Sequence, residues 1–351
     1  MRGWVIVTPE QPTETSARRR EPSMEDVARE AGVSGQTVSR VVNARGYVGA
    51  ATRERVEAAM QSLGYRPNSA ARALRSGRFR TIGVVMFSFS SYGNQRTLDA
   101  IAVRAAQLGY ALTLIPVESS AGETVAGAFR RLEEHAVDGI IIVIEAHQLD
   151  EADIEIPDAL PVVFVDSNRG ETLPFVDTDQ AQGARLATEH LLELGHDTVW
   201  HVTGPARSYS AERRRDAWRE TLEKHRRPVP EPLQGDWSAA SGYVAGLRLR
   251  EIDGVTAVFA ANDQMAIGVL RAFREAGREV PGDVSLVGFD GLPDAAQLWP
   301  PLTTVQQHPE RVGALAVDAL LAELDGTGRQ QTPLVSTELV VRESTAAPRK
   351  R

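Results

Sequence analysis

Hydrophobic positions between residues 24 and 43 recur at helical spacing in two short runs that Gly32 separates. The apolar faces consist of Val27, Ala28 and Ala31 in the first run and Val38, Val41 and Val42 in the second. Ser23 and Asp26 have the spacing of a capping box before the first run, and Ser34 can cap the second. The pattern predicts two short helices joined by a turn, which is the form of a helix-turn-helix.

The second predicted helix carries a polar stripe opposite its apolar face. Gln36, Arg40 and Asn43 recur at i, i+4 and i+7 and therefore share one side. In the DNA major groove arginine pairs with guanine and glutamine with adenine. The candidate DNA contacts of this segment are Ser34, Gly35, Gln36, Thr37, Ser39, Arg40 and Asn43. Spacing alone also allows an ordinary amphipathic hairpin with a solvated face.

A third helix is predicted to follow, with Thr52 as its cap and Gly64 at its end. Its expected buried face comprises Val56, Ala59, Met60 and Leu63. Three short helices can enclose a small core, so we expect an all-α helix-turn-helix domain over residues 23–66. Residues 67–80 are expected to form a short hinge helix and linker, although a flexible arginine-rich linker is the other interpretation.

Charge is distributed unevenly along the chain. Residues 16–80 contain 13 arginines, no lysine and 6 acids, a net charge of +7, whereas the whole chain carries −8. Since residues 1–15 contribute −1, residues 81–351 carry −14. A basic head attracts phosphates and an acidic body is repelled by them, which localises contact with nucleic acid to the head.

Beyond residue 80, short apolar runs alternate with helical stretches. The runs cover Ile82–Phe87, Ala111–Val117, Gly139–Glu145, Val162–Asp166, Thr198–Thr203, Ala257–Ala260 and Ser285–Phe289. This alternation is typical of parallel sheets buried on both faces by helices. It predicts an α/β core over residues 81–343, with a tail at residues 344–351.

The remaining composition narrows the class of protein. Residues 1–22 are rich in Pro, Thr, Glu and Arg, which predicts a disordered N-terminal extension. The apolar run near the start is too short for a signal peptide, and no segment suits a membrane span. The chain has no cysteine, which fits a reducing compartment. We therefore expect a cytoplasmic protein with no membrane partner.

Polar residues follow several of the predicted core strands. They are Asp166, Asn262, Asp263 and Asp290. Ligands of doubly wound sheets bind at the carboxyl ends of the strands, and acids and amides there suit hydrogen bonding to sugar hydroxyls. Strand-end acids also cap helices, and Asp263 is the better candidate for a cap.

Several motifs in fixed order resemble the lactose-repressor (LacI/GalR) family of bacterial transcription regulators. They are Asp26-Val27-Ala28, Ala31-Gly32-Val33-Ser34, Thr37-Val38-Ser39-Arg40-Val41, Leu63-Gly64-Tyr65-Arg66-Pro67-Asn68, Ala261-Asn262-Asp263-Gln264-Met265-Ala266 and Val287-Gly288-Phe289-Asp290. The resemblance covers about residues 22–343, and residues 235–242 resemble the member after which the family is named. It implies a two-lobed periplasmic-binding-protein-like core with a ligand between the lobes. It also implies that a strand within residues 334–342 returns to the first lobe.

The resemblance further implies roles for individual residues. In the hinge helix, Asn68 and Leu74 match DNA-contacting positions, and the leucine would wedge between base pairs in the minor groove. In the pocket, the ligand-binding positions match Ser88, Asp166, Arg214, Trp237, Asn262, Asp290 and Gln307. An indole over an apolar ring face, with polar groups around it, suits a pyranose. From the residues alone Trp237 could equally be a core side chain.

Some positions depart from the member after which the family is named. Gly35 replaces a residue with a side chain, so the operator sequence does not transfer. Phe87 stands where that protein has a small polar residue, beside Ser88, and Pro309 stands where it has an aromatic. These changes leave the identity of the sugar open. Without leucine heptads after the core we expect a homodimer, and two-fold symmetry then implies a palindromic operator in double-stranded DNA.

The hypothesis from sequence is a repressor whose operator affinity is controlled by a small sugar such as a galactoside. We expect no catalytic residues, no cofactor and no metal, because the chain contains no phosphate loop or HExxH motif and its histidines are scattered. The alternatives are a non-sugar corepressor such as a nucleobase, a secreted sugar-binding protein, and a glycoside hydrolase using Asp166 with Asp290. Whether the ligand weakens or strengthens DNA binding is open.

Overall fold

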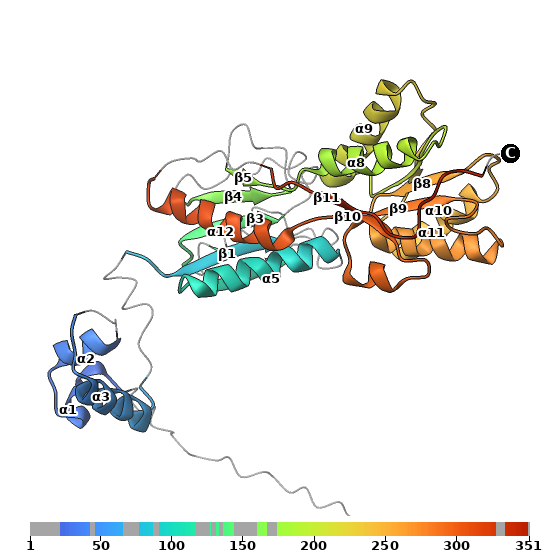
Figure 1. The fold of residues 1–351 in the computed structure, drawn as a ribbon. Helices are drawn as coiled ribbons and strands as arrows, with labels where there is room; N and C mark the ends of the chain where they lie inside the picture. The colour runs from blue at the N-terminus through green and yellow to red at the C-terminus, as the bar shows by residue number, and fades with distance from the viewer. Residues whose placement is uncertain are drawn as a thin grey trace, which may run out of the picture. The chain divides into compact units, whose positions relative to one another are not determined.

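The computed structural model describes residues 22–42, 46–65, 77–86, 91–116, 127, 131–132, 136–143, 160–166, 174–327 and 334–349. The chain divides into two compact units, Met1–Arg78 and Phe79–Arg351 (Figure 1). Nearly all of the expected N-terminal extension and residues 67–76 of the expected hinge lie outside the described residues. Among those that are described, no helix combines the length and apolarity needed to cross a membrane.

Three helices form the described part of the first unit: α1 (Met24–Ala31), α2 (Gly35–Val42) and α3 (Ala50–Leu63). The expected capping box is confirmed, because the Ser23 hydroxyl accepts from the Asp26 N–H and the Asp26 carboxylate accepts from the Ser23 N–H. Gly32 ends α1 with a φ of 65°, a conformation that favours glycine. The expected cap at Thr52 is wrong, since α3 already begins after Gly49 and has no side-chain cap.

The interior of this unit is small and apolar. Val27, Val38 and Val56 contribute one fully buried side chain from each helix. Ala28, Ala31, Val41 and Ala59 are also buried, with Val42, Met60 and Leu63 partly buried around them. These side chains form the predicted faces of all three helices, so hydrophobic periodicity located the core of the unit correctly.

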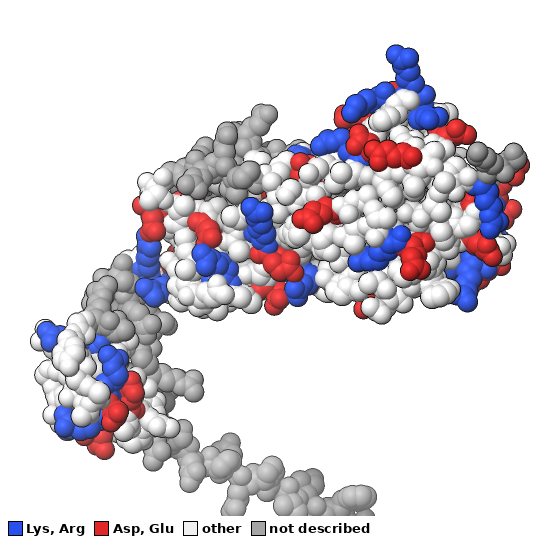
Figure 2. Space-filling model, in the orientation of Figure 1, with Lys and Arg blue, Asp and Glu red and all other residues white. Residues whose placement is uncertain are grey.

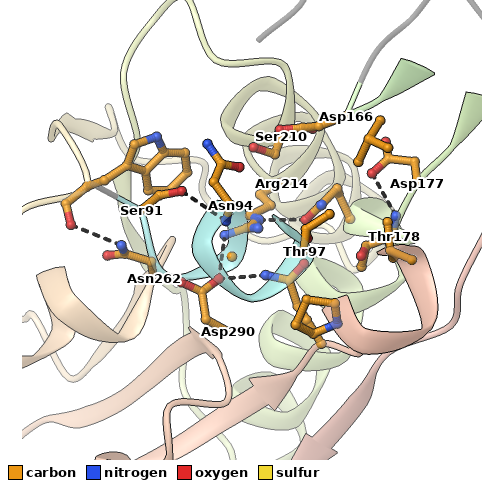
Figure 3. Close-up of a pocket in the computed structure, with 17 residues that line it drawn as sticks. Ser91, Asn94, Thr97, Asp166, Asp177, Thr178, Ser210, Arg214, Asn262 and Asp290 are labelled. Carbon is orange, nitrogen blue, oxygen red and sulfur yellow. Dashed lines mark hydrogen bonds and ion pairs between the residues drawn. The ribbon is translucent and has the colours of Figure 1, made fainter. Parts of the chain in front are cut away.

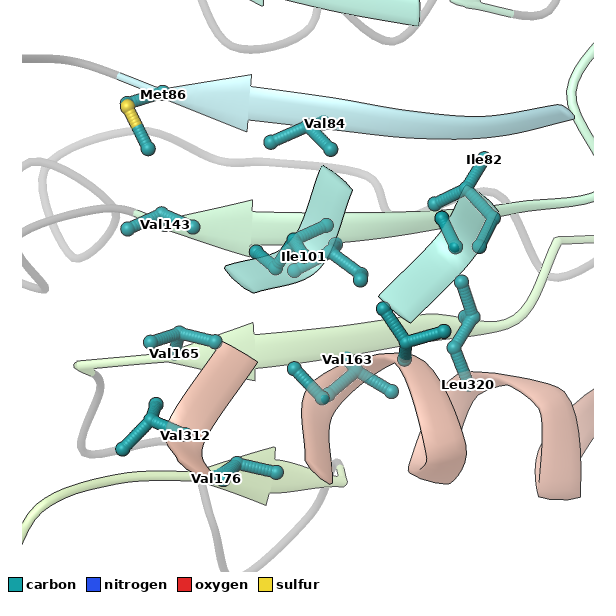
Figure 4. Close-up of a cluster of buried hydrophobic side chains, with 14 of the residues drawn as sticks. Ile82, Val84, Met86, Ile101, Val143, Val163, Val165, Val176, Val312 and Leu320 are labelled. Atoms are coloured by element: carbon teal, nitrogen blue, oxygen red, sulfur yellow. The ribbon is translucent and has the colours of Figure 1, made fainter. Parts of the chain in front are cut away.

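The first lobe of the second unit is built on a five-stranded parallel sheet in the order β2-β1-β3-β4-β5. Its strands are β1 (Thr81–Met86), β2 (Ala111–Pro116), β3 (Gly139–Val143), β4 (Val162–Val165) and β5 (Phe175–Val176). Helices α5 (Tyr92–Gln107) and α12 (Pro309–Leu324) cover one face, with Ile101 and Leu320 packed on Ile82 and Val163 (Figure 4). The strands β3 and β4 are buried throughout, as their continuous apolar runs predict.

The second lobe is built on a six-stranded sheet in the order β11-β10-β9-β8-β6-β7. Its strands are β6 (Trp200–Thr203), β7 (Leu233–Gln234), β8 (Ala257–Ala260), β9 (Ser285–Asp290), β10 (Thr303–Gln306) and β11 (Glu338–Val340). Phe259 and Phe289 face α8 (Gln180–Glu193) and α9 (Tyr209–Lys224). Val258 and Leu286 face α10 (Ala239–Leu249) and α11 (Asp263–Glu275) on the other side.

The chain crosses between the lobes three times. Residues 177–179 lead from β5 to α8, residues 307–308 lead from β10 to α12, and the chain returns near Val335. The Val335 N–H donates to the Asp177 carbonyl and the Val335 carbonyl accepts from the Asp179 N–H, both at 2.8 Å. The first and third crossings are therefore hydrogen-bonded to each other.

The expectation that residues 334–342 carry a strand of the first lobe is wrong. Strand β11 pairs antiparallel with β10 and so extends the second sheet. Among the described residues of this segment, Val335 alone forms a bridge beside β5, to Thr178. The following residues also stay with the second lobe, where Ser344 exchanges hydrogen bonds with Leu286 and the Ala346 N–H donates to Ser285. The third crossing is complete before β11 begins, which leaves this strand at the open edge of β10.

Basic and acidic side chains are interspersed over the face of the second unit that Figure 2 presents. Several pairs are short, such as Arg96 with Glu310 at 2.8 Å and Arg104 with Asp318 at 2.8 Å, which link α5 to α12. Exposed ion pairs of this kind contribute up to about 1 kcal/mol each. The stability of the lobe therefore depends mainly on its buried apolar faces.

A glycine contact between α10 and α11 gives a test of this packing. A Cβ at Gly268 would collide with the backbone of α10, at the Ala239 carbonyl oxygen and the Tyr243 nitrogen. We expect Gly268→Ala to lower the free energy of unfolding by about 1–3 kcal/mol in urea denaturation. The control is Gly93→Ala in α5, where a Cβ meets nothing within 4 Å and a gain of up to about 1 kcal/mol is expected. Equal changes in the free energy of unfolding for the two substitutions would contradict the close contact of α10 and α11 at Gly268.

Candidate functional site

A polar pocket lies where the strands of the two lobes end (Figure 3). Its lining residues are Ser91, Gly93, Asn94, Thr97, Val165, Asp166, Asp177, Thr178, Gln180, Ser210, Arg214, Trp237, Asn262, Asp290, Gln307, Pro309 and Val312. They come from the first turn of α5, the carboxyl ends of β4, β5 and β9, the crossings, and the starts of α8, α9 and α12. This is the edge at which doubly wound sheets bind ligands.

A buried guanidinium occupies the middle of the pocket. Arg214, in the second turn of α9, is 4% exposed. Its Nε donates to Gln180 Oε1 at 2.8 Å, and its Nη1 donates to the Ala261 carbonyl and approaches Asp290 Oδ1 at 3.5 Å. The guanidinium also lies 3.7 Å from the centre of the Phe289 ring. A buried charge must be paired, and these four groups hold Arg214 in one place.

Asp290 is the acid that faces this guanidinium. Its Oδ1 also accepts from Gln307 Nε2 at 2.6 Å, so it joins α9 to the second crossing. Burial raises the pKa of Asp290 to about 6, although the nearby Arg214 charge favours its ionised form. Its backbone has a φ of 107°, a region that L-residues rarely adopt. Strained backbone of this kind is frequent at ligand sites, where the surrounding structure enforces it.

The indole of Trp237 closes another side of the pocket. Trp237 is only partly buried, and its backbone φ of 73° lies in the left-handed region. Asn262 Nδ2 donates to its carbonyl at 3.0 Å, and Gly204 leaves room for the ring, because a Cβ there would collide with the indole. Arg214 lies 5.4 Å from the ring centre. The indole is thus held beside the buried charge with part of its surface free for a ligand.

Six of the predicted pocket residues line this one cavity: Asp166, Arg214, Trp237, Asn262, Asp290 and Gln307. They come from six separate segments of the sequence. Ser88 lies outside the described residues. Pro309, which we noted as a departure, also lines the pocket, at the first turn of α12.

The expectation that Asp263 caps α11 is wrong. The cap is Asn262, whose Oδ1 accepts from the Met265 N–H at 2.8 Å. Asp263 instead accepts from the Thr304 hydroxyl and from the Leu292 N–H. Its carboxylate therefore links the loop after β9 to strand β10, and Asn262 combines the helix cap with support for Trp237.

Other lining residues were not identified from sequence. They are Ser91, Asn94, Thr97, Asp177, Thr178, Gln180 and Ser210. Asp177 follows β5, a strand of two residues, which is too short to show a hydrophobic run. Ser91 and Asn94 had a usable signal, since Ser91 caps α5 directly after the first strand and its gap. Gln180 and Ser210 look like ordinary first-turn residues until Arg214 is placed beside them.

The second helix of the first unit presents the predicted polar side. Val38 and Val41 are buried, whereas Gln36 and Arg40 are exposed on the opposite side. Ser34 is exposed as well, and its hydroxyl accepts from the Thr37 N–H at 3.2 Å, as the expected cap. Gly35 and Ser39 also lie on α2 and are partly exposed, while Asn43, Asn68 and Leu74 lie outside the described residues.

A helix-turn-helix unit and a two-lobed core with a polar pocket between its lobes together define a ligand-regulated DNA-binding protein. Residues 23–68 match the bacterial regulatory proteins of the lacI family, and residues 188–345 match a periplasmic binding protein-like domain. The chain is 38% identical over 330 residues to the lactose operon repressor of Escherichia coli strain K12, covering 92% of this chain and 90% of that protein. It belongs to the lacI family of bacterial regulatory proteins.

Solved structures agree with this assignment. The lac repressor dimer bound to operator and the anti-inducer ONPF matches with a TM-score of 0.84 and 36% identity, over 93% of this chain and 100% of that one. The complex of the transcriptional regulator CelR with cellobiose matches with a TM-score of 0.64 and 31% identity, over 92% and 99% of the two chains. The relatives named here are transcriptional regulators, and the α/β fold with a helix-turn-helix unit is the one the sequence predicts.

The buried acids make stability depend on pH in a defined direction. Burial, together with the charge of Asp290, raises the pKa of Asp263 to about 7. Stability from a carboxyl with a raised pKa is complete below its unfolded pKa of about 4 and is lost as the pH rises to about 7.

We therefore expect wild-type stability to fall, relative to Asp263→Asn, between pH 4 and pH 7, by about 1 kcal/mol or more. Urea unfolding of both proteins across this range measures the difference, with Asp197→Asn as a control because the Asp197 side chain is 98% exposed. A stability difference between wild type and Asp263→Asn that stays constant from pH 4 to pH 7 would contradict the raised pKa of Asp263.

Proposed function

We propose that this chain is a sequence-specific transcriptional repressor whose affinity for operator DNA is controlled by a small sugar bound between the lobes of its core. The observation that carries the effector half is the set of polar groups around Arg214, open to a pocket that the Trp237 indole borders. An apolar ring face beside convergent donors and acceptors suits a pyranose. The relatives support a sugar, since one is a lactose operon repressor and another is a regulator in complex with cellobiose.

The DNA half of the proposal rests on α2. Its exposed Gln36 and Arg40 have the side-chain chemistry that reads base edges in the major groove. Ser34, Gly35, Thr37, Ser39 and Asn43 are proposed to contact the operator around them, and Asn68 and Leu74 to contact it from the hinge. A relative bound to operator supports this arrangement. Such a regulator acts where the chromosome is, in the cytoplasm, and its operation includes no chemical step.

The proposed control works through the crossings between the lobes. Arg214 donates to Gln180, which starts α8 after the first crossing, and Asp290 accepts from Gln307 on the second crossing. A ligand that engages Arg214 or Asp290 therefore acts on groups attached to both crossings. The ligand changes DNA affinity only if it binds more tightly to one arrangement of the lobes than to the other, and if DNA also distinguishes these two arrangements.

A homodimer completes the proposal. Trp299 is 85% exposed and borders a groove that Ile267 and Leu270 of α11 also line. Ile267 and Leu270 are partly exposed, and an apolar groove with a large exposed side chain at its edge is typical of a protein interface. The lac repressor relative is a dimer on its operator. Two copies of α2 would then read a palindromic site.

Operator reading is tested by removing one base-reading side chain. Arg40→Ala should weaken binding to the protein's own operator about 10- to 100-fold, because one bidentate base contact is worth about 1–3 kcal/mol. Fluorescence anisotropy on palindromic DNA from around its own gene measures this at stated salt. Binding to random DNA should change far less, and Arg219→Ala, which removes an exposed arginine of the core, should change neither. Equal losses on operator and random DNA would show that Arg40 contacts only phosphate.

The sugar pocket is tested through the indole. Trp237→Ala should lower the affinity for a sugar that releases operator by at least about tenfold, because an aromatic face over the ring is lost. Trp237→Phe keeps a ring and should lose less. Both variants should still bind operator, so the anisotropy signal remains and only the sugar concentration needed for release increases. An unchanged release curve for Trp237→Ala would place the ligand elsewhere.

A further inference from the structure

Two carboxylates stand side by side at one end of the pocket, and each has an oxygen that accepts no hydrogen bond from the described residues. Asp166 follows β4 and Asp177 follows β5, and these strands pair in parallel with Val165 opposite Val176. The two acids therefore leave the sheet at the same edge, and Figure 3 places them together, away from Asn262. Oδ1 of Asp166 and Oδ2 of Asp177 are buried and accept no hydrogen bond within the described structure.

The contacts of Asp177 account for only one of its two carboxylate oxygens. The side chain lines the pocket and belongs to a residue that is only 3% exposed. Oδ1 accepts from the Thr178 N–H at 2.6 Å, which leaves Oδ2 as an inward acceptor. A buried acceptor without a donor is costly, and a turn residue needs only one of the two oxygens. The second oxygen is suited to a donor that arrives with a ligand.

The hydrogen bonds that Arg214 makes in the described structure go to groups other than this pair of acids. Among the described lining residues, Asp166, Asp177 and Asp290 bring three carboxyl groups and Arg214 the one guanidinium. Arg214 uses Nε on Gln180 and Nη1 on the Ala261 carbonyl and Asp290. Its charge favours the ionised form of Asp166, but no hydrogen bond joins them in the described structure.

The charges of Arg213 and Arg214 lower the pKa of both acids but do not outweigh the effect of burial. The Ser210 hydroxyl donates to Asp166, and Arg213, on the same helix, donates instead to the Tyr209 hydroxyl at 2.7 Å. Burial first, and then the charge of Asp166, raises the pKa of Asp177 well above its usual range. The two acids alone therefore favour holding a proton between them. A bound cation would let both carboxylates stay ionised, because it supplies the positive charge that the proton otherwise supplies.

The geometry points to a ligand with a protonated amine, whose ammonium group lies between Asp166 and Asp177. An ammonium donates three hydrogen bonds and carries the missing positive charge, whereas a hydroxyl donates one and carries none. This inference rests on the proposed function and specifies its ligand: the effector is an amino sugar. The ring would lie beside Trp237 and Arg214, and the amine would reach the ends of β4 and β5.

Matched sugars test the inference on the full-length protein. The probes are D-glucosamine, D-galactosamine and 6-amino-6-deoxy-D-glucose, each compared with its neutral parent, and the two 2-amino sugars also with their N-acetyl forms. Titration calorimetry at pH 7 should give at least one amine a tenfold or greater advantage over its neutral counterparts. The same amine should release labelled operator in anisotropy at a correspondingly lower concentration than the parent does.

Variants assign the advantage to the pair. Asp177→Asn should reduce the ratio of amine to neutral affinity at least tenfold, and Asp166→Asn should reduce it as well. Asp197→Asn, an exposed acid-to-amide change, should leave the ratio unaltered. Thermal unfolding establishes that each variant is folded, and an asparagine at 177 can still accept from the Thr178 N–H.

The outcomes separate the inference from the function on which it rests. If neutral sugars bind and release operator as well as the amines do, the inference is overturned and the sugar-controlled repressor stands. An amine advantage that survives in both pocket variants also overturns it. If no sugar of either kind changes operator affinity, the proposed sugar control fails and the inference fails with it.

Discussion

The burial of one guanidinium at the joint between the lobes is the constraint on which the site depends. Arg214 is satisfied by Gln180 at the start of α8, the Ala261 carbonyl directly after β8 and Asp290 at the end of β9. Asp290 in turn is tied to Gln307 on the second crossing. A charge this deeply buried cannot move without its partners, because leaving it unpaired costs several kcal/mol. A ligand that engaged Arg214 would therefore act on groups next to the segments that connect the lobes.

The backbone around the pocket also helps to position the polar side chains. Asp166, Trp237 and Asp290 all have positive φ values, of 59°, 73° and 107°. Asp166 directly follows β4, Trp237 lies in a bend before α10 and Asp290 is the last residue of β9, and all three line the cavity. Such conformations cost about 1–3 kcal/mol apiece and persist only where the surrounding structure enforces them. Here the core packing on both faces of each sheet supplies that enforcement, and the polar groups are positioned before any ligand arrives.

Sequence patterns predicted the parts whose physical cause is local. The buried faces of α1 to α3, the capping box at Ser23 and the long strands follow from periodicity over several residues. Strands of two residues, such as β5 and β7, carry no such signal, and Asp177 was missed with β5. The placement of β11 depends on which sheet edge is open, and the exchange of roles between Asn262 and Asp263 depends on the neighbouring Thr304. Asp166, Asn262 and Asp290 were predicted from their places at strand ends, whereas Arg214, Trp237 and Gln307 were predicted only because a family resemblance supplied the tertiary contacts.

We propose that sugar binding in the pocket and operator binding through α2 depend on the same conformational equilibrium. The most direct measurement is the affinity of an operator-releasing sugar for the free protein and for the protein saturated with operator. Because coupling is reciprocal, the sugar should bind the operator complex more weakly by the same factor by which it weakens operator binding, about 5- to 150-fold. A sugar that binds the free and operator-bound protein with equal affinity would contradict the account.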